Sequence, residues 1–255
     1  MSRGFTDVTL LRVTTSTDAA RPSRRERLRE ATLREITEAG RAQLRTVGPQ
    51  GLTLSAVARE LGMTAPALYR YVDGVEGLIT LLVAEGFVDL SEQLEAARDA
   101  VDPHDHGRRF QAVCEAVRRW ALADRAQYGL LFGSPLPGYA APEDGPTTDG
   151  ARRAAGVLWQ VLIDAQADGQ LGRPLVTSVD PLALPLLEDR VSGGLGEALA
   201  PEVQAAGWAA LSLLLGAVAV EVFGHMPACD ATTGAAVFRG KVDVARCILG
   251  LPAPR

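Results

Sequence analysis

The stretch LTLSAVARELGMTAPALYRYVDG, residues 52–74, contains two short helical patterns joined by a turn at Gly62. The first pattern places apolar residues at the spacing of one helical face: Leu54, Val57, Ala58 and Leu61. Thr53 stands where a helix N-cap is needed, and a glycine at 62 allows the left-handed residue that ends a helix. Isolated helices this short are unstable in water, so longer helices must pack against the pair.

The second pattern begins at Thr64, a further N-cap candidate, and Pro66 lies in its first turn, where a missing N–H costs little. Leu68 points back toward the first pattern. The opposite face carries hydroxyls, small groups and one guanidinium: Thr64, Ala65, Ala67, Tyr69 and Arg70. Such a face fits the major groove of DNA, where Arg reads guanine and small apolar groups meet thymine methyls. A helical hairpin with a solvated face is the alternative.

Long amphipathic patterns flank the pair, at residues 24–47 and 75–98. Charge is distributed unevenly along the chain. Residues 21–71 hold ten arginines and five glutamates, whereas residues 72–255 hold 14 basic and 24 acidic residues. The net charge of −5 therefore hides a basic N-terminal segment, which predicts a polyanionic partner for that segment only.

Residues 24–87 resemble the DNA-binding domain of the TetR family of bacterial transcriptional repressors. The matching positions are Leu52-Thr53, Val57-Ala58, Leu61-Gly62, Pro66, Leu68-Tyr69, Val72 and Leu78. The resemblance implies a helix-turn-helix that binds an operator in double-stranded DNA. By position, it implies groove contacts from Thr64, Ala65, Pro66, Ala67 and Arg70. It also implies phosphate contacts from Thr53, Ser55, Tyr69 and Tyr71.

One position departs from that family. The start of the next helix usually offers a lysine to the DNA backbone, and this chain has Val75 there, after Gly74. Backbone N–H groups at a helix start can still meet a phosphate. The departure leaves open a helical ligand-binding or protein-binding dimer with weak or lost DNA binding.

The remainder of the chain shows further helical patterns, at residues 108–123, 125–132, 151–167, 181–199, 201–223 and 233–249. Residues 133–150 are rich in proline and glycine and predict a long loop. No strand-like alternation is convincing, so the predicted fold class is all-α. The expected organisation is a disordered leader (1–22), the helix-turn-helix domain (23–74) and a larger helical domain (75–255), with helix 75–98 connecting the two.

The segments WALADRAQYGLLFGSPLPGY and GWAALSLLLGAVAVEVFGH resemble the C-terminal ligand-binding and dimerisation domain of an actinobacterial-type TetR subgroup. This resemblance implies that the last two helices form a four-helix bundle with a second copy. The candidate interface residues are Gly207, Ala210, Leu214, Gly216, Ala217, Val237 and Val244. A homodimer would hold two short helices about 34 Å apart, which suits two half-sites of a palindrome.

Aromatic and polar residues of the middle helices are candidates for lining a ligand cavity: Trp120, Tyr128, Phe132, Trp159, Gln160, Trp208, Glu221 and His225. Core filling is the alternative for each aromatic residue. Glu221 lies in an otherwise apolar helix and needs a partner; we expect His225, one turn later, or a polar group of the ligand. The expected effector is a small, largely apolar molecule that weakens operator binding.

Other functional classes find little support. An enzyme using Glu221 and His225 as acid and base would lack a nucleophile, a metal cluster or a phosphate loop, so we expect no enzyme and no cofactor. His104 and His106 flank an aspartate, which is the pattern of a metal site, but a solvated loop is favoured because two further ligands are lacking. The three cysteines are far apart and form no C-x-x-C pair, as is typical of a reducing cytoplasm.

Membrane insertion and export are also disfavoured. Residues 1–20 lack the apolar segment and cleavage site of a signal peptide. Residues 203–220 are 18 residues without a charge, which is the threshold for a membrane span. Gln204, Ser212 and the immediately following Glu221 favour a buried core helix instead.

Overall fold

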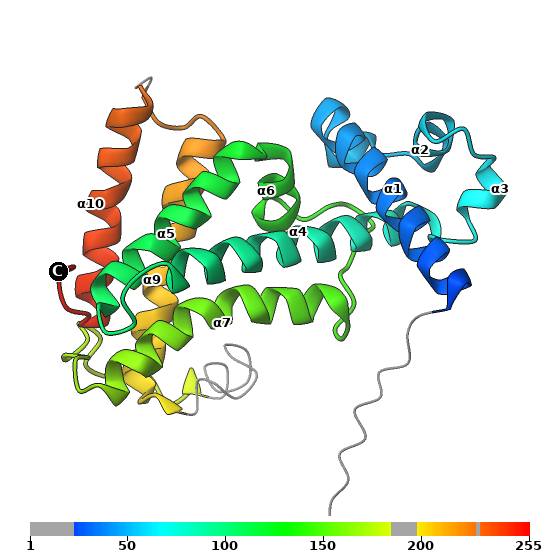
Figure 1. Cartoon of the computed structure of the whole chain (residues 1–255). Helices are drawn as coiled ribbons and strands as arrows, with labels where there is room; N and C mark the ends of the chain where they lie inside the picture. The colour runs from blue at the N-terminus through cyan, green and yellow to red at the C-terminus, as the bar shows by residue number, and fades with distance from the viewer. Residues whose placement is uncertain (1–22, 185–197, 228–229) are drawn as a thin grey trace, which may run out of the picture.

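The computed structural model describes residues 23–184, 198–227 and 230–255, and every regular element in these ranges is a helix. The all-α class is confirmed. Figure 1 shows α1, α2 and α3 at one end of the molecule and α5, α7, α9 and α10 at the other, with α4 running between them. The expected leader, Cys229 and most of the helix expected at 181–199 lie outside the described residues.

The N-terminal elements are α1 (Arg24–Val47), the 3-10 turn η1 (Pro49–Gly51), α2 (Leu54–Glu60), α3 (Ala65–Leu68) and the long α4 (Gly74–Asp99). Ser23 starts α1 with a capping box, in which its Oγ accepts from the Glu26 N–H at 3.2 Å and its own N–H donates to the Glu26 carboxylate. A small apolar cluster joins these helices through Ile36, Leu44, Leu54, Val57, Leu68, Leu78 and Leu82.

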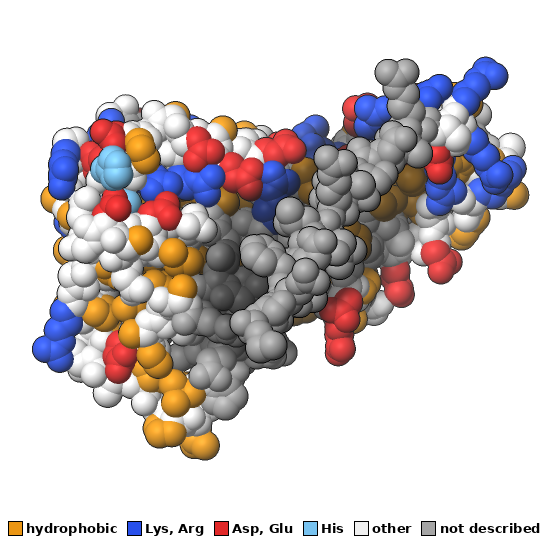
Figure 2. Space-filling model, turned by 60° about the horizontal axis from the view of Figure 1, so that its bottom comes forward, with side chains coloured by type: hydrophobic (Ala, Val, Ile, Leu, Met, Phe, Trp, Pro, Cys, Tyr) orange, Lys and Arg blue, Asp and Glu red, His pale blue; other side chains and the backbone are white. Residues whose placement is uncertain are grey.

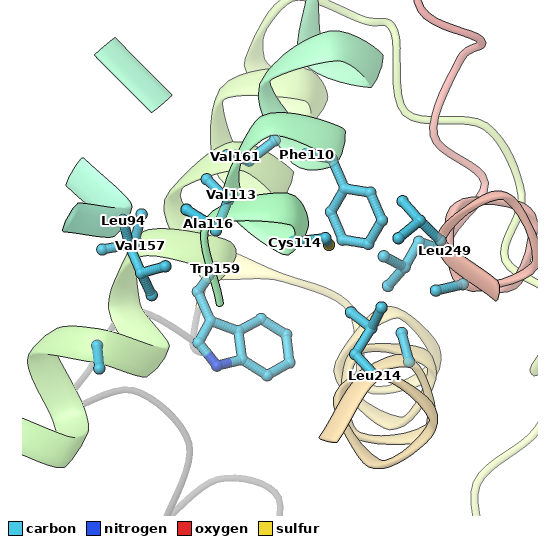
Figure 3. Close-up of a cluster of buried hydrophobic side chains, with 14 of the residues drawn as sticks. Leu94, Phe110, Val113, Cys114, Ala116, Val157, Trp159, Val161, Leu214 and Leu249 are labelled. Carbon is cyan, nitrogen blue, oxygen red and sulfur yellow. The ribbon is translucent and has the colours of Figure 1, made fainter. Parts of the chain in front are cut away.

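The larger part consists of α5 (His106–Ala123), α6 (Arg125–Phe132), α7 (Pro146–Ala167), α9 (Pro201–Val222) and α10 (Ala231–Leu249). The loop before α7 is shorter than expected, because Pro146 occupies the first turn of that helix, where no N–H is needed. A second apolar cluster fills the space between these helices, and Figure 3 shows Phe110, Trp159, Leu214 and Leu249 converging on it from four of them.

Helix α9 is the one helix in the described part of the chain that is long and apolar enough to cross a membrane by length and composition. It packs against α10, α5 and α6, and it contributes Ala206, Ala210, Leu214 and Val218 to the larger cluster. A core helix passes the same test of length and composition. The packing is therefore that of a core helix, as its interrupted sequence predicts.

The packing of α9 corrects four of the residues expected at a dimer interface. Gly207, Ala210, Leu214 and Ala217 are buried within their own chain. The clearest case is Gly207, where an added Cβ would lie 2.2 Å from Cη2 of Trp159. The small residues of α9 thus allow other helices of the same chain to pack closely against it. The other three, Gly216, Val237 and Val244, are exposed.

Glu221 pairs with Arg118 of α5, and the expectation of a Glu221–His225 pair is wrong. Both carboxylate oxygens accept bonds from the guanidinium, at 2.7 Å from Nε and 2.5 Å from Nη2. The two side chains are 13% and 16% exposed, and the guanidinium also lies over the Phe238 ring. Glu221 faces α5, whereas His225 is exposed beyond the end of α9.

The loop containing His104 and His106 is tied to the end of α7. Asp168 Oδ2 lies 2.8 Å from His104 Nδ1 and 2.9 Å from His106 Nε2, and the His106 side chain is only 1% exposed. The expectation of a solvated loop is therefore correct for His104 and wrong for His106. Asp168 follows more than sixty residues later, which is why the local pattern does not reveal it.

We expect the Arg118–Glu221 pair to be strongly coupled. Glu221→Leu alone should lower the free energy of unfolding by about 3 kcal/mol, because it leaves a buried guanidinium without its partner. The double variant Arg118→Leu with Glu221→Leu should recover a large part of that loss. Urea unfolding of both single variants and the double variant gives the coupling energy, and strictly additive losses would contradict the prediction.

Asp168 raises the pKa of the His104 imidazole through a hydrogen bond and its charge, and His104 and His106 in turn lower the pKa of Asp168. The His104 contribution to stability is present at acid pH and is lost as pH rises through its folded pKa. The Asp168 contribution is lost as pH falls through its own lowered pKa. In Asp168→Asn, the His104 pKa should fall toward about 6.5, as NMR titration of the ring measures; an unchanged pKa would refute the coupling.

Candidate nucleic-acid interface

The turn between α2 and α3 is built from local hydrogen bonds. Thr53 Oγ1 accepts from the Ala56 N–H at 3.4 Å, and the Thr53 N–H donates to Gln43 of α1 at 2.9 Å. At the other end of α2, Gly62 has φ +63°, and the Met63 N–H donates to the Ala58 carbonyl at 2.8 Å. A left-handed residue at this point suits glycine, and it turns the chain from α2 into the segment that leads to α3.

Helix α3 is a single turn that buries one residue and exposes most of the others. Leu68 is fully buried, and Ala67 is half-buried. The exposed residues on its outer side are Thr64, Ala65, Pro66, Tyr69 and Arg70. Thr64 occupies the N-cap position without a side-chain cap bond, which corrects the capping role expected from the sequence, and the residue is exposed.

The two tyrosines after Leu68 have different surroundings. Tyr69 is 59% exposed, whereas Tyr71 is half-buried against the smaller apolar cluster. Arg29 of α1 lies with its guanidinium 5.6 Å from the centroid of the Tyr71 ring, and its Nη1 donates to the Arg70 carbonyl at 3.4 Å. Tyr71 therefore helps to fix the end of α3. Arg29 lies 41 residues from Arg70 in the chain, and no local pattern marks it out.

The N-terminus of α4 offers little positive charge. Val75 is half-buried and packs against the smaller cluster, Gly74 has φ +69°, and the exposed Glu76 places an anion in the first turn. Thr53 and Ser55 at the start of α2 are both exposed. The hydroxyls of α2 are thus better placed for a phosphate than the start of α4.

Arginines gather over this end of the molecule. Figure 2 shows many basic side chains, all of them arginines by sequence, over the part formed by α1 to α3, with fewer acidic ones among them. The exposed arginines include Arg24, Arg25, Arg29, Arg34, Arg59 and Arg70. A local excess of arginine attracts a polyanion even though the whole chain is acidic.

The larger part contains a cavity of about 680 Å³ between α4, α7 and α9. Of the eight expected ligand residues, Phe132, Trp159 and Trp208 line it. The aliphatic residues that complete its walls include Leu90, Leu94, Leu158 and Leu211. Leucines at helical spacing carry no signature of a cavity, so sequence reasoning missed them.

The other five expected ligand residues have different roles. Trp120 donates from Nε1 to Asp89 at 2.8 Å, and Tyr128 donates from its hydroxyl to the Leu215 carbonyl at 3.0 Å. Burial raises the pKa of Tyr128 to about 12, so that hydroxyl stays protonated. Gln160 Nε2 donates to Asp164 of the same helix, Glu221 accepts from Arg118, and His225 is exposed. Trp120 and Tyr128 fill the core, which is the alternative weighed for the aromatic residues.

Helices α4 and α6 connect the cavity to α1. Phe87 of α4 and Phe132 of α6 line the cavity. Asp124 Oδ2, at the start of α6, lies 2.6 Å from Nη2 of Arg45 in α1, and Asp124 Oδ1 also caps α6 by accepting from the Gln127 N–H. Gln127 Nε2 donates to the Leu82 carbonyl of α4 at 2.8 Å. A chain of direct contacts therefore runs from the cavity wall to α1.

Two family profiles match the chain. Residues 36–79 match bacterial regulatory proteins of the tetR family, and residues 110–244 match the tetracyclin repressor-like C-terminal domain. The HTH-type transcriptional regulator Rv1816 of Mycobacterium tuberculosis is 32% identical over 229 residues, which cover 90% of this chain and 97% of that protein.

Solved structures share the fold. The regulatory protein SCO4313 aligns with a TM-score of 0.62 at 30% identity, over 88% of this chain and 98% of that one. The transcriptional regulator FadR from Bacillus subtilis, solved in complex with stearoyl-CoA, aligns with a TM-score of 0.58 at 11% identity, over 86% and 99%. At that identity FadR is similar in fold alone.

Gly62→Ala should lower both stability and DNA affinity. The left-handed conformation costs a residue with a Cβ about 1 kcal/mol. Apart from the two chain neighbours of Gly62, no atom in the described part of the chain lies within 4 Å of the added carbon. Gly169→Ala is the matched control, because Gly169 has φ +66° and equally open surroundings but lies at the end of α7. Thermal unfolding should show similar losses for both variants, and gel-shift titration should show weaker DNA binding for Gly62→Ala only.

Proposed function

The chain belongs to the TetR family of bacterial regulatory proteins, and from that premise we propose that it is a homodimeric repressor, released from a palindromic operator by a small, largely apolar effector. Proteins of this family are transcriptional regulators with a helix-turn-helix, and they are not enzymes. The proposal is carried by one observation above all. The exposed face of α3 stands on the arginine-rich end of an otherwise acidic chain.

We assign the groove contacts to Thr64, Ala65, Pro66, Ala67 and Arg70, and the phosphate contacts to Thr53, Ser55 and Tyr69. Arg70 has the fork of donors that reads guanine, and the small residues of α3 allow close approach to the bases. Tyr71 has a supporting role in this proposal, because its ring packs against Arg29 and the smaller cluster.

The proposed dimer uses the outer face of α9 and α10. Along α10, Val237, Gly240 and Val244 are exposed at helical spacing, and Gly216 is exposed on α9. Apart from the backbone of its own helix and its two chain neighbours, no atom of the described residues lies within 4 Å of a Cβ added at Gly216 or Gly240, so a second copy has room to approach the backbone there. An isologous contact of two such helix pairs gives a four-helix bundle with twofold symmetry.

The effector is assigned to the cavity between α4, α7 and α9. Its volume lies within the range of small-molecule sites, and its walls are mainly apolar. FadR shows that this fold can hold an acyl compound. Release requires that the effector bind more tightly to the form of the dimer that fits the operator poorly. We place the protein in the cytoplasm, where the DNA is.

A helical dimer that binds a ligand or a protein, with weak DNA binding, is the second candidate. The observation that favours it is the start of α4, where Val75 is turned inward and Glu76 is exposed. The two candidates differ in whether substitutions on α3 change DNA affinity.

We expect the protein to bind the DNA that flanks its own gene, in the presence of excess nonspecific competitor, with an affinity that falls steeply with salt. Arg70→Ala should weaken binding by about tenfold or more, as the loss of a guanine contact requires. Tyr69→Phe should weaken it less and leave the salt dependence unchanged, because the lost phosphate contact carries no charge. The control Arg173→Ala removes an exposed arginine of the larger part and should have no effect. Equal DNA affinity in all four proteins would favour the second candidate.

A further inference from the structure

The cavity between α4, α7 and α9 has a polar end and an apolar end. Glu143, Thr148 and Arg152 line it near the start of α7, and Trp159 lines it further along the same helix. At a rise of 1.5 Å per residue, Thr148 and Trp159 lie about 16 Å apart along the helix axis. The cavity is therefore elongated, with its polar groups gathered at the end nearer to Phe87 and Phe132.

Arg152 is the one cation among the described residues of that lining. Its side chain is 46% exposed, and its ion pair with Asp149, one turn earlier on α7, is loose at 3.6 Å. A half-exposed arginine with a distant partner can turn toward the polar end of a ligand at little cost. Among the described lining residues, the apolar end offers no such group.

Trp159 closes the apolar end, and its position is set by a glycine. The indole is buried, and its edge lies on the α9 backbone at Gly207, where an added Cβ would meet Cη2 at 2.2 Å and Cζ3 at 2.5 Å. Figure 3 shows the ring reaching from α7 toward α9. A glycine at 207 thus lets the ring seat fully against α9.

A second, much smaller apolar space adjoins the indole. Its volume is about 20 Å³, and it shares four residues with the larger cavity: Ala155, Leu158, Trp159 and Leu211. Its other walls include Phe110 and Leu249, which belong to the core. Trp159 therefore forms part of the partition between the effector cavity and the space that leads into the core.

On the basis of the proposed effector-released function, we propose that the effector is an elongated amphiphile and that Trp159 sets the longest apolar tail it can carry. The polar end of the effector lies beside Thr148 and Arg152. The tail runs along α7 between the leucines of α4 and α9 and ends against the indole. Gly207 is the positioning residue that holds the indole at this depth.

The test uses straight-chain saturated fatty acids, from hexanoate to palmitate, titrated calorimetrically into the full-length protein. Each methylene that enters the cavity should increase affinity by about fourfold, the equivalent of about 0.8 kcal/mol. In the wild-type protein the increase should stop at the chain length that reaches Trp159. Trp159→Phe and Trp159→Leu remove part of the wall and should move this limit to longer acids.

Gly207→Ala should move the limit in the opposite direction. The added methyl group displaces the indole from α9 into the cavity and shortens the room for a tail. A general loss of stability cannot produce shifts of opposite sign. Trp120→Phe is the matched control, because Trp120 is buried in the same core but lines neither space, and it should leave the limit unchanged.

Three results would overturn the inference: no binding of any acid by any variant, affinities independent of chain length, or the same limit in wild type and both Trp159 variants. Operator binding by the same preparations separates this inference from the proposed function. If the protein binds its operator but the chain-length limit does not move, the inferred role of Trp159 is wrong, whereas the proposed function as a repressor is retained. If the limit moves as expected without operator binding, the cavity is as inferred and the repressor function fails.

Discussion

The structure depends on α4, which contributes buried residues to two different apolar clusters. Leu78 and Leu82, near its start, belong to the cluster that supports α2 and α3, whereas Leu90 and Leu94 belong to the cluster of the larger part. A helix of 26 residues spans about 39 Å, so one rigid rod connects the DNA-facing turn with the cavity wall. Neither the short α3 nor the cavity would keep its position without this shared helix.

The sequence was most informative where structure is local. Helical spacing, the cap at Thr53 and the glycine at 62 were sufficient to predict α2, the turn and the outward face of α3, because each depends on residues within one or two turns. The start of α7 was placed too late, since a segment rich in proline and glycine reads as a loop although Pro146 is well suited to a first helical turn.

Partners that are distant in the chain could not be predicted in the same way. Glu221 was recognised as needing a partner, but Arg118 lies 103 residues earlier, and only the packing of α9 on α5 brings the two together. The glycine and alanines of α9 suggested an interface between copies, yet small residues equally allow a large neighbour such as Trp159 to fit closely within one chain. Sequence spacing identifies a small-residue face and cannot say which neighbour occupies it.

Asp124 joins two tasks that are usually separate. One oxygen caps α6, and the other holds Arg45 of α1, and this carboxylate is mostly buried. The attraction between the two charges falls gradually with distance, and the half-exposed guanidinium of Arg45 can follow a small movement of α6. A substitution at Asp124 would nevertheless remove the cap of α6 and its bond to α1 together, so the two roles cannot be changed independently at this residue.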